Sequence, residues 1–170
     1  MTEIREAEVK DCKDIARIIV QAWQTAYEGI IPEDYVHALN RDRYVDIMEK
    51  NITKRLEKIL IAERDGRSVG FISGRKLTGD YDCETVGLYI DPAYQRLGAG
   101  RKLLCSMMAY FKNQNLNRMI IWTLLGAANN AFYERMGGKI IERKELSIGA
   151  GNYAGVGFSF DLDQSFSTVS

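Results

Sequence analysis

Gln95-Arg96-Leu97-Gly98-Ala99-Gly100 is a glycine-containing segment that follows a predicted strand over residues 85–90 and begins a predicted helix. Its two glycines let the backbone approach a ligand closely, and the first turn of a helix carries amides that have no partner within the helix. An anion bound there gains about 0.3–1 kcal/mol from the helix dipole before any hydrogen bond is counted. The segment therefore predicts a pyrophosphate site.

Two better-known phosphate-binding loops do not fit this segment. A Walker loop needs Gly-Lys followed by Ser or Thr, whereas Arg101 and Lys102 follow Gly100. The dinucleotide-binding motif GxGxxG needs a third glycine, where this sequence has Leu103. What remains is a QxxGxG motif between a strand and a helix.

This motif and its flanks resemble the cofactor-binding segment of small bacterial members of the GNAT superfamily, which are acyl-CoA-dependent N-acetyltransferases. The family's loop reads Gln or Arg, x, x, Gly, x, then Gly or Ala. Residues 85–94 (TVGLYIDPAY) are similar to the family's strand and its exit into the loop, and residues 132–138 (FYERMGG) are similar to a later helix. The resemblance extends over residues 4–162, and residues 88–101 are its specific part.

The resemblance implies an α+β fold, a GNAT-like central mixed β-sheet flanked by helices in a single domain. The implied element order is β-α-α-β-β-β-α-β-α-β-β. An N-acetyltransferase domain is expected at residues 1–162 and a C-terminal tail at residues 163–170. A chain of 170 residues is long enough for one well-buried core, which agrees with a single domain.

The hydrophobic pattern predicts elements that agree with this fold. Asp11 caps a first helix that ends at Gly29, Pro32 begins a second helix through Leu39, and a third covers residues 42–54. Two later helices are predicted, one after Gly98 and one over residues 127–136. Strands are predicted over residues 4–7, 59–63, 69–75, 83–90, 119–124, 140–148 and 155–161, with a hairpin turn at Asp65-Gly66.

Composition narrows the class of protein. Lys plus Arg and Asp plus Glu each total 23, so no overall field attracts nucleic acid or anionic lipid. The apolar runs are too short to span a bilayer, and we expect a soluble cytoplasmic protein. Cys12, Cys83 and Cys105 are not spaced as a metal or redox pair, and His37 is the single histidine, so no metal is expected.

Acetyl transfer from a thioester to an amine requires the neutral amine, and deprotonating a lysine-like amine at pH 7 costs about 4.6 kcal/mol. Glu84 is the candidate base. Strict alternation puts Glu84, Val86, Leu88 and Ile90 on one face of the strand, and the resemblance implies a water-relaying glutamate near this point. The alternative is a solvated glutamate at the entrance of a strand.

Tyr133 is the second candidate catalytic residue, because the family has a tyrosine here that donates to the departing thiolate of coenzyme A. A thiol of pKa about 8.5 is more acidic than a tyrosine of about 10, so full proton transfer is uphill by roughly 2 kcal/mol. We therefore expect Tyr133 to hydrogen-bond the developing charge. The alternative is a tyrosine whose ring packs beneath the cofactor.

The resemblance also implies the contacts of acetyl-CoA, the expected co-substrate. The strand backbone at residues 88–90 faces the pantetheine arm, and Gly87 suits a departure from regular pairing. Arg96, Arg101 and Lys102 can reach phosphates, and the alternative for each is a solvated loop charge. The expected cofactor-binding residues are Leu88, Tyr89, Ile90, Gln95, Arg96, Leu97, Gly98, Ala99, Gly100, Arg101 and Asn129.

Asn129 enters this set because of a departure from the family pattern. Gly126 stands where the family has an asparagine that binds the pantetheine, seven residues before the tyrosine. Asn129 lies four residues before Tyr133 on the same predicted helix face and offers a substitute, whereas Asn130 is expected to face elsewhere. An asparagine this early in a helix also serves as a cap.

Trp23 and Tyr27 are the candidate substrate-binding residues, since the early helices line the acceptor side in GNAT folds. A pair with this spacing is also typical of a core or its rim. Glu28, Glu33 and Asp34 suit a cationic amine, although acidic residues at helix starts also favour the helix dipole. The acceptor is expected to be a small-molecule or peptide amine.

Three functions fit these observations. The first is an N-acetyltransferase in which a primary amine attacks acetyl-CoA directly in a ternary complex, because no nucleophile near the loop is placed to accept the acyl group. The second is a catalytically weak or inactive CoA-binding sensor. The third is a binder of nucleotide phosphate, which the missing lysine disfavours. By analogy with the family a homodimer is expected, with the glycine-containing C-terminal strands as its edge.

Overall fold

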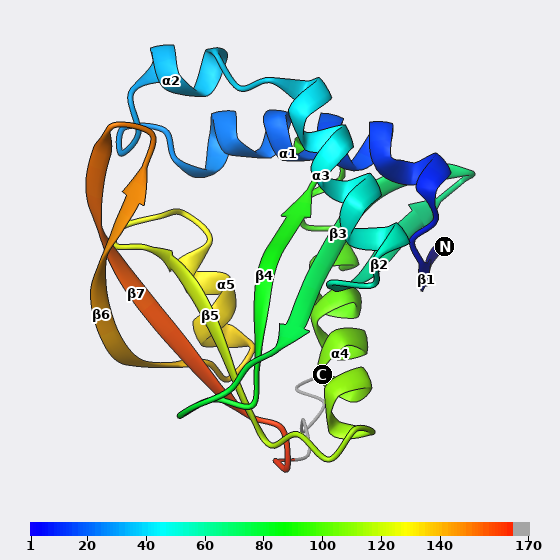
Figure 1. Cartoon of the computed structure of the whole chain (residues 1–170), viewed down its shortest axis with the longest axis vertical. Helices are drawn as coiled ribbons and strands as arrows, with labels where there is room; N and C mark the ends of the chain where they lie inside the picture. The colour runs from blue at the N-terminus through cyan, green and yellow to red at the C-terminus, as the bar shows by residue number, and fades with distance from the viewer. Residues whose placement is uncertain (165–170) are drawn as a thin grey trace.

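Seven strands form one mixed sheet in the order β1-β2-β3-β4-β5-β7-β6 (Figure 1). The computed structural model describes residues 1–164, so most of the tail expected at residues 163–170 lies outside the described residues. Every neighbouring pair of strands is antiparallel except β4 and β5, which are parallel. The strands are β1 (Thr2–Glu6), β2 (Lys58–Arg64), β3 (Arg67–Lys76), β4 (Cys83–Ile90), β5 (Arg118–Leu124), β6 (Lys139–Ile148) and β7 (Gly151–Asp161). The expected α+β class is confirmed.

Helices cover both faces of this sheet (Figure 1). They are α1 (Cys12–Ala26), α2 (Glu33–His37), α3 (Arg41–Thr53), α4 (Ala99–Lys112) and α5 (Asn130–Arg135), with short 3-10 turns η1 (Val9–Asp11) and η2 (Pro92–Tyr94). The structure has three helices between β1 and β2, one more than the order implied by the resemblance. The additional helix is α2, the short helix that Pro32 had indicated. None of the helices in residues 1–164 is long and apolar enough to cross a membrane.

Local sequence explains several of these elements. The buried residues of α1 recur at helical spacing and include Ile15, Ile18 and Ile19, so one face of the helix packs on the sheet. Asp65 and Gly66 have φ of 51° and 74° and connect β2 to β3 as the predicted hairpin. These two predictions are confirmed.

The predicted helix over residues 127–136 was too long at its start. The helix α5 begins only at Asn130, and the chain turns at Gly126, which has a φ of 79°. The left-handed region favours glycine, so this residue marks a break in the backbone that a helical pattern does not reveal. The segment from Gly126 to the start of α5 is a turn.

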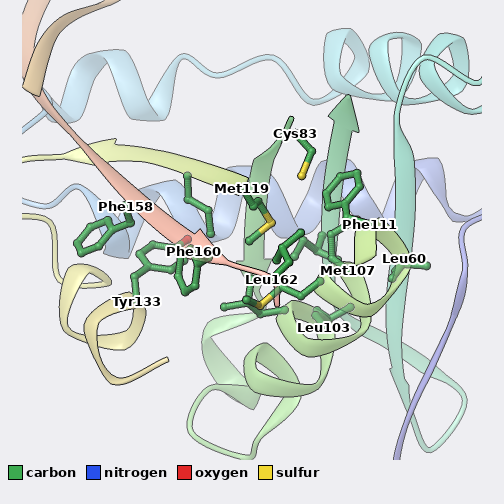
Figure 2. Packing of buried hydrophobic residues seen from close by; sticks show 14 of the residues in the cluster. Leu60, Cys83, Leu103, Met107, Phe111, Met119, Tyr133, Phe158, Phe160 and Leu162 are labelled. Carbon is green, nitrogen blue, oxygen red and sulfur yellow. The ribbon is translucent and has the colours of Figure 1, made fainter. Parts of the chain in front are cut away.

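The core consists of a layer on each face of the sheet. Under α4 and α5, a large cluster includes Leu103, Met107, Phe111, Met119 and Phe158 (Figure 2). On the opposite face, α1 and α3 pack over Ile59, Ile61 and Phe71. Membership of one cluster or the other therefore tells which face of the sheet a strand residue occupies.

The strand β4 has two irregularities that shape the site. Ser73 pairs with Gly87 but Gly74 pairs with Thr85, so Val86 is an extra residue that forms a β-bulge. Pairing of β4 with β5 covers only residues 83–85 of β4, and the strands then diverge (Figure 1). Beyond that point β4 is paired on its β3 side alone, and a gap opens between β4 and β5.

Candidate active site

The QxxGxG segment forms the connection that the sequence predicted. It follows η2, where the Asp91 side chain accepts a hydrogen bond from the Ala93 amide at 3.0 Å, and it enters α4 through Gly98, which has a φ of 86°. Among the described residues, the amides from Gly98 to Arg101 donate no backbone hydrogen bond, and the first donor is Lys102 N to Gly98 O at 3.1 Å. These amides form a cradle for an anion.

Side chains of this segment divide into exposed and buried ones. Gln95, Arg96 and Leu97 are exposed, and Ala99 is buried at the start of α4. A Cβ on Gly100 would lie 3.5 Å from the Phe132 ring and 3.7 Å from Ile90 Cγ1. The first turn of α4, the end of β4 and α5 therefore meet at Gly100.

The three cations near this cradle, Arg96, Arg101 and Lys102, have different surroundings. Arg96 and Arg101 are exposed, and within residues 1–164 neither forms an ion pair. Lys102 instead donates a hydrogen bond from Nζ to the backbone oxygen of Thr2 at 2.8 Å. This contact ties the ammonium group of Lys102 to β1, which leaves Arg96 and Arg101 as the exposed arginines beside the cradle.

The backbone of Leu88, Tyr89 and Ile90 lies along the gap between β4 and β5. Leu88 and Ile90 pack toward the α4 side, whereas Tyr89 packs toward α1 and α3. On the edge facing the gap, the main-chain groups of these residues have no partner strand within residues 1–164. Unpaired strand edges offer amides and carbonyls to an extended ligand.

Glu84 lies on a different face from the one predicted. Arg75 pairs with Glu84, and both side chains lie on the face of the sheet away from α4. The bulge at Val86 then reverses the alternation, so the side chains of Leu88 and Ile90 face α4. One extra residue turns every later side chain to the other face, which simple alternation from Leu88 did not include. Glu84 therefore shares its face with Tyr89.

The carboxylate of Glu84 is already paired. Its Oε1 accepts hydrogen bonds from Nε and Nη2 of Arg75 at 2.6 and 2.5 Å. The side chain is only 14% exposed, so the solvated glutamate considered from sequence does not describe it.

Sequence reasoning missed a second glutamate, Glu57, between α3 and β2. Its Oε2 is buried without a hydrogen-bond partner among the described residues. Burial raises the pKa of this carboxyl, and the charge of Glu84 adds to the effect, whereas Ser73 and Arg75 oppose it. No local motif indicates this residue, because its burial depends on contacts with β3.

Tyr133 is 4% exposed on α5, and its ring packs against that of Phe158 at a centroid distance of 5.5 Å (Figure 2). The ring of Phe132 lies at a centroid distance of 5.4 Å from that of Tyr133. Burial, together with the nearby hydroxyl of Tyr89, raises the pKa of Tyr133 above its usual value. Tyr89 belongs to β4 and Tyr133 to α5, so the two side chains come from opposite sides of the gap. Tyr133 keeps its phenolic proton at neutral pH.

The two predicted substrate-binding residues lie beside Tyr89. Trp23 donates a hydrogen bond from Nε1 to the Tyr89 hydroxyl at 3.2 Å. The rings of Trp23 and Tyr27 meet edge to face, with centroids 4.9 Å apart. Burial raises the pKa of Tyr27 to about 12, and the hydroxyls of Tyr27 and Tyr89 influence each other. Three hydroxyls, those of Tyr27, Tyr89 and Tyr133, therefore lie near the gap.

Asn129 precedes α5, as its sequence position indicated. Its Oδ1 accepts a hydrogen bond from the Thr123 hydroxyl at 3.3 Å. Asn130 does not face elsewhere, because its Oδ1 lies 3.1 Å from the same hydroxyl and its Nδ2 donates to Leu124 O at 2.9 Å. Both asparagines are thus held at the end of β5, on the α5 side of the gap.

A pocket of about 150 Å³ lies where α1 and α2 meet. It is lined by Gln24, Tyr27, Glu28, Ile31, Glu33, Val36 and His37. Tyr27 belongs to both this pocket and the hydroxyl cluster, and Glu28 and Glu33 make the pocket acidic.

The cysteines supply no acyl-accepting nucleophile beside the cradle. Burial raises the pKa of Cys83 to about 12 and raises the pKa of Cys12, so both stay protonated thiols. Cys105 lies within α4. Within residues 1–164, no group of three or more His, Cys, Asp or Glu side chains is arranged to hold a metal ion.

Known proteins resemble this chain in sequence and in fold. The family model described as "Acetyltransferase (GNAT) family" matches residues 18–138. The uncharacterized N-acetyltransferase YuaI of Bacillus subtilis is 33% identical over 138 residues, which cover 79% of this chain and 78% of that protein. The spermidine N(1)-acetyltransferase of Thermoplasma acidophilum is 24% identical over 119 residues, covering 67% of this chain and 73% of the relative.

Solved structures agree with these matches. The PaiA N-acetyltransferase of Thermoplasma acidophilum, in complex with coenzyme A, superposes with a TM-score of 0.76 at 18% identity, over 95% of this chain and 99% of that one. YncA from Salmonella typhimurium, a structure with acetyl-CoA, gives a TM-score of 0.70 at 20% identity, over 98% and 97% of the two chains. With the family model matching most of its length, the chain belongs to the GNAT family and is an acetyltransferase of that family.

Proposed function

We propose that this chain transfers an acetyl group from acetyl-CoA to a primary amine, by direct attack of the amine in a ternary complex. The observation that carries the proposal is the meeting of the α4 cradle, the end of β4 and α5 at Gly100. A pyrophosphate at the cradle can continue as an extended arm along the free edge of β4. Complexes of two structural neighbours with coenzyme A or acetyl-CoA support this placement.

In this arrangement the chain's own groups divide the chemistry between them. The free main-chain groups at residues 88–90 orient the thioester along the gap. Tyr133, protonated and largely dry, donates a hydrogen bond to the sulfur as negative charge develops on it. With both reactants held together, part of the entropic cost of attack is met on binding.

The proposed acceptor is a cationic amine. The pocket between α1 and α2 opens beside Tyr27 and is lined by Glu28 and Glu33, which favour a positively charged group. The spermidine N(1)-acetyltransferase among the relatives supports a polyamine as the first amine to test.

Amine-dependent release of free thiol from acetyl-CoA tests the proposal. We expect release with spermidine or another polyamine, and weaker release with peptides that carry a free amino terminus. Stabilisation by acetyl-CoA without release for polyamines, amino acids, aminoglycosides or peptides would contradict the proposal and favour the catalytically inactive CoA-binding sensor. Stabilisation by ATP as strong as by acetyl-CoA would favour the nucleotide-phosphate binder.

A further inference from the structure

Arg17 of α1 makes an ion pair with Asp91, the residue that begins η2 just before the cradle. Arg17 Nη1 lies 2.6 Å from Asp91 Oδ2, and the two side chains are 28% and 13% exposed. The two residues are 74 positions apart in sequence, so only the fold brings them together. Solvent and salt screen a partly buried pair of this kind less than a surface pair. The charge of Arg17 therefore acts at the exit of β4.

The two carboxylate oxygens of Asp91 have separate tasks. Oδ2 binds Arg17, and Oδ1 accepts a hydrogen bond from the Ala93 amide at 3.0 Å. The backbone of Asp91 is held as well, because its amide donates to Val69 O at 2.9 Å and its carbonyl accepts from the Tyr94 amide at 2.8 Å. Asp91 thus fixes the turn from which the QxxGxG segment continues.

The guanidinium group of Arg17 joins three parts of the fold. Its Nη2 donates to Ser68 O, at the start of β3, at 3.1 Å. Its Nη1 also donates to Gln21 Oε1 at 3.0 Å, and its Nε lies 3.5 Å from Asp14 Oδ1. All three nitrogens therefore have partners, and the rigid fork holds α1, β3 and η2 together.

A pocket of about 390 Å³ lies beside this junction. Arg17 and Asp91 both line it, together with Ser68 and Tyr94. Because the pocket leaves one side of the Asp91 carboxylate without apolar packing, the position of this carboxylate depends on its ion pair and hydrogen bonds.

The segment between η2 and α4 has few contacts of its own. The side chains of Gln95, Arg96 and Leu97 are exposed, and Arg96 has a φ of 62°, which is uncommon for a residue other than glycine. Among the described residues, the amides from Gly98 to Arg101 donate no backbone hydrogen bond. The shape of this segment therefore depends on its two anchored ends, which are η2 and α4.

We propose that Arg17 is a positioning residue for acetyl-CoA, which acts through Asp91 to hold the cradle in the shape that receives the pyrophosphate. The inference rests on the placement of the pyrophosphate at the cradle under the proposed function. A loop that already has its bound shape loses less conformational freedom on binding, so the ion pair raises the affinity for coenzyme A without touching it. The effect falls on the pyrophosphate end of the co-substrate.

Calorimetric titration with CoA and with dephospho-CoA, which lacks the 3′-phosphate, tests the inference. We expect Arg17→Gln to raise the Kd of both ligands about 10-fold. Lys13→Gln is the matched control, because it removes the same charge from an exposed position on the same helix, and it should leave both values unchanged. Arg17→Lys keeps the charge but not the fork and should give an intermediate rise. A larger loss for CoA than for dephospho-CoA would overturn the inference, because it would indicate direct contact with the 3′-phosphate.

Kinetics with a truncated donor separate positioning from a general disturbance of the fold. Acetylpantetheine carries the thioester but not the pyrophosphate. At saturating spermidine, Arg17→Gln should lower kcat/KM for acetyl-CoA about 10-fold through KM, with kcat unchanged. The value of kcat/KM for acetylpantetheine should stay at that of wild type. An equal loss with both donors would contradict a role at the cradle.

Combining Arg17→Gln with Asp91→Asn keeps the inference testable if the single change affects folding, since no buried charge is then left unpaired. If the two side chains act as a unit, the double variant binds CoA no more weakly than Arg17→Gln. Losses that multiply those of the two single variants overturn the inference, as does a wild-type Kd in Arg17→Gln. A wild-type chain that binds CoA without amine-dependent release contradicts the proposed function alone, and one that binds no CoA contradicts both.

Discussion

The indole nitrogen of Trp23 donates a hydrogen bond to the hydroxyl of Tyr89 across 3.2 Å, joining α1 to β4 beside the gap. The residue proposed to line the acceptor side and the strand proposed to hold the thioester are therefore directly connected. A change in the position of α1 should therefore shift the edge of β4 at Tyr89.

Replacing Trp23 with Phe should weaken this connection while keeping an aromatic ring. We expect the free energy of unfolding to fall by about 0.5–1.5 kcal/mol, the usual net value of such a hydrogen bond. The KM for the amine should rise while the affinity for CoA changes little. Trp122→Phe on β5 is the matched control, and an equal rise of KM in both variants would contradict a specific role for Trp23.

Replacing Tyr133 with Phe should lower kcat by about 10- to 10³-fold with little change in CoA affinity, because only the hydroxyl is lost. The raised pKa of Tyr133 keeps the phenol protonated, so no basic limb of the wild-type profile below pH 10 should belong to it. Steady-state kinetics and calorimetric CoA titration measure both effects. Tyr110→Phe on α4 serves as control, and unchanged kcat in Tyr133→Phe would refute the role.

Replacing Gly98 with Ala should impair binding of CoA. The residue has a φ of 86° with open space around it, so the added Cβ strains the backbone by about 1–2 kcal/mol and displaces the amides of the cradle. Gly66→Ala is the matched control, since its φ is 74° and no atom lies near its Cβ position. Both variants should lose similar stability, and only Gly98→Ala should lose the rise in melting temperature with CoA.

Glu57 should make stability fall as pH rises. Its folded-state pKa lies above the ordinary value of 4.5, so the folded chain binds a proton more tightly than the unfolded chain between these two values. The stabilisation is complete below the ordinary value and is lost as pH rises through the folded one. In Glu57→Gln this loss should be absent, so its advantage over wild type in urea denaturation should grow from pH 4 to 8. A parallel pH dependence would argue against burial of the charge.

Local signals explain which parts of the site could be predicted. The cradle was found because the glycines, the preceding strand and the following helix are all encoded within a short stretch that ends at Gly100. The bounds of β4 were also predicted correctly. The facing of Glu84 was not, because the bulge at Val86 arises from register with β3, which alternation along one strand does not contain.

Long-range packing decided the remaining features. Glu57 was missed because a glutamate between a helix and a strand is ordinarily solvated, and only the folded structure reveals that its Oε2 is buried. The contact of Lys102 with the backbone of Thr2 was not foreseen, because these two residues lie far apart in sequence. Which side chains oppose each other across elements is the information that a single sequence did not supply here.

The three residue pairs that join β4 to β5 make the sheet two antiparallel halves that share a short seam. One half carries β1 to β4, and the other carries β5, β6 and β7. In the proposed complex, an extended ligand lying in the gap would supply hydrogen bonds where a neighbouring strand would, so the co-substrate itself would complete the sheet. Occupancy of the gap should then couple the motions of the two halves, with the reacting carbonyl of the proposed complex on the line along which they meet.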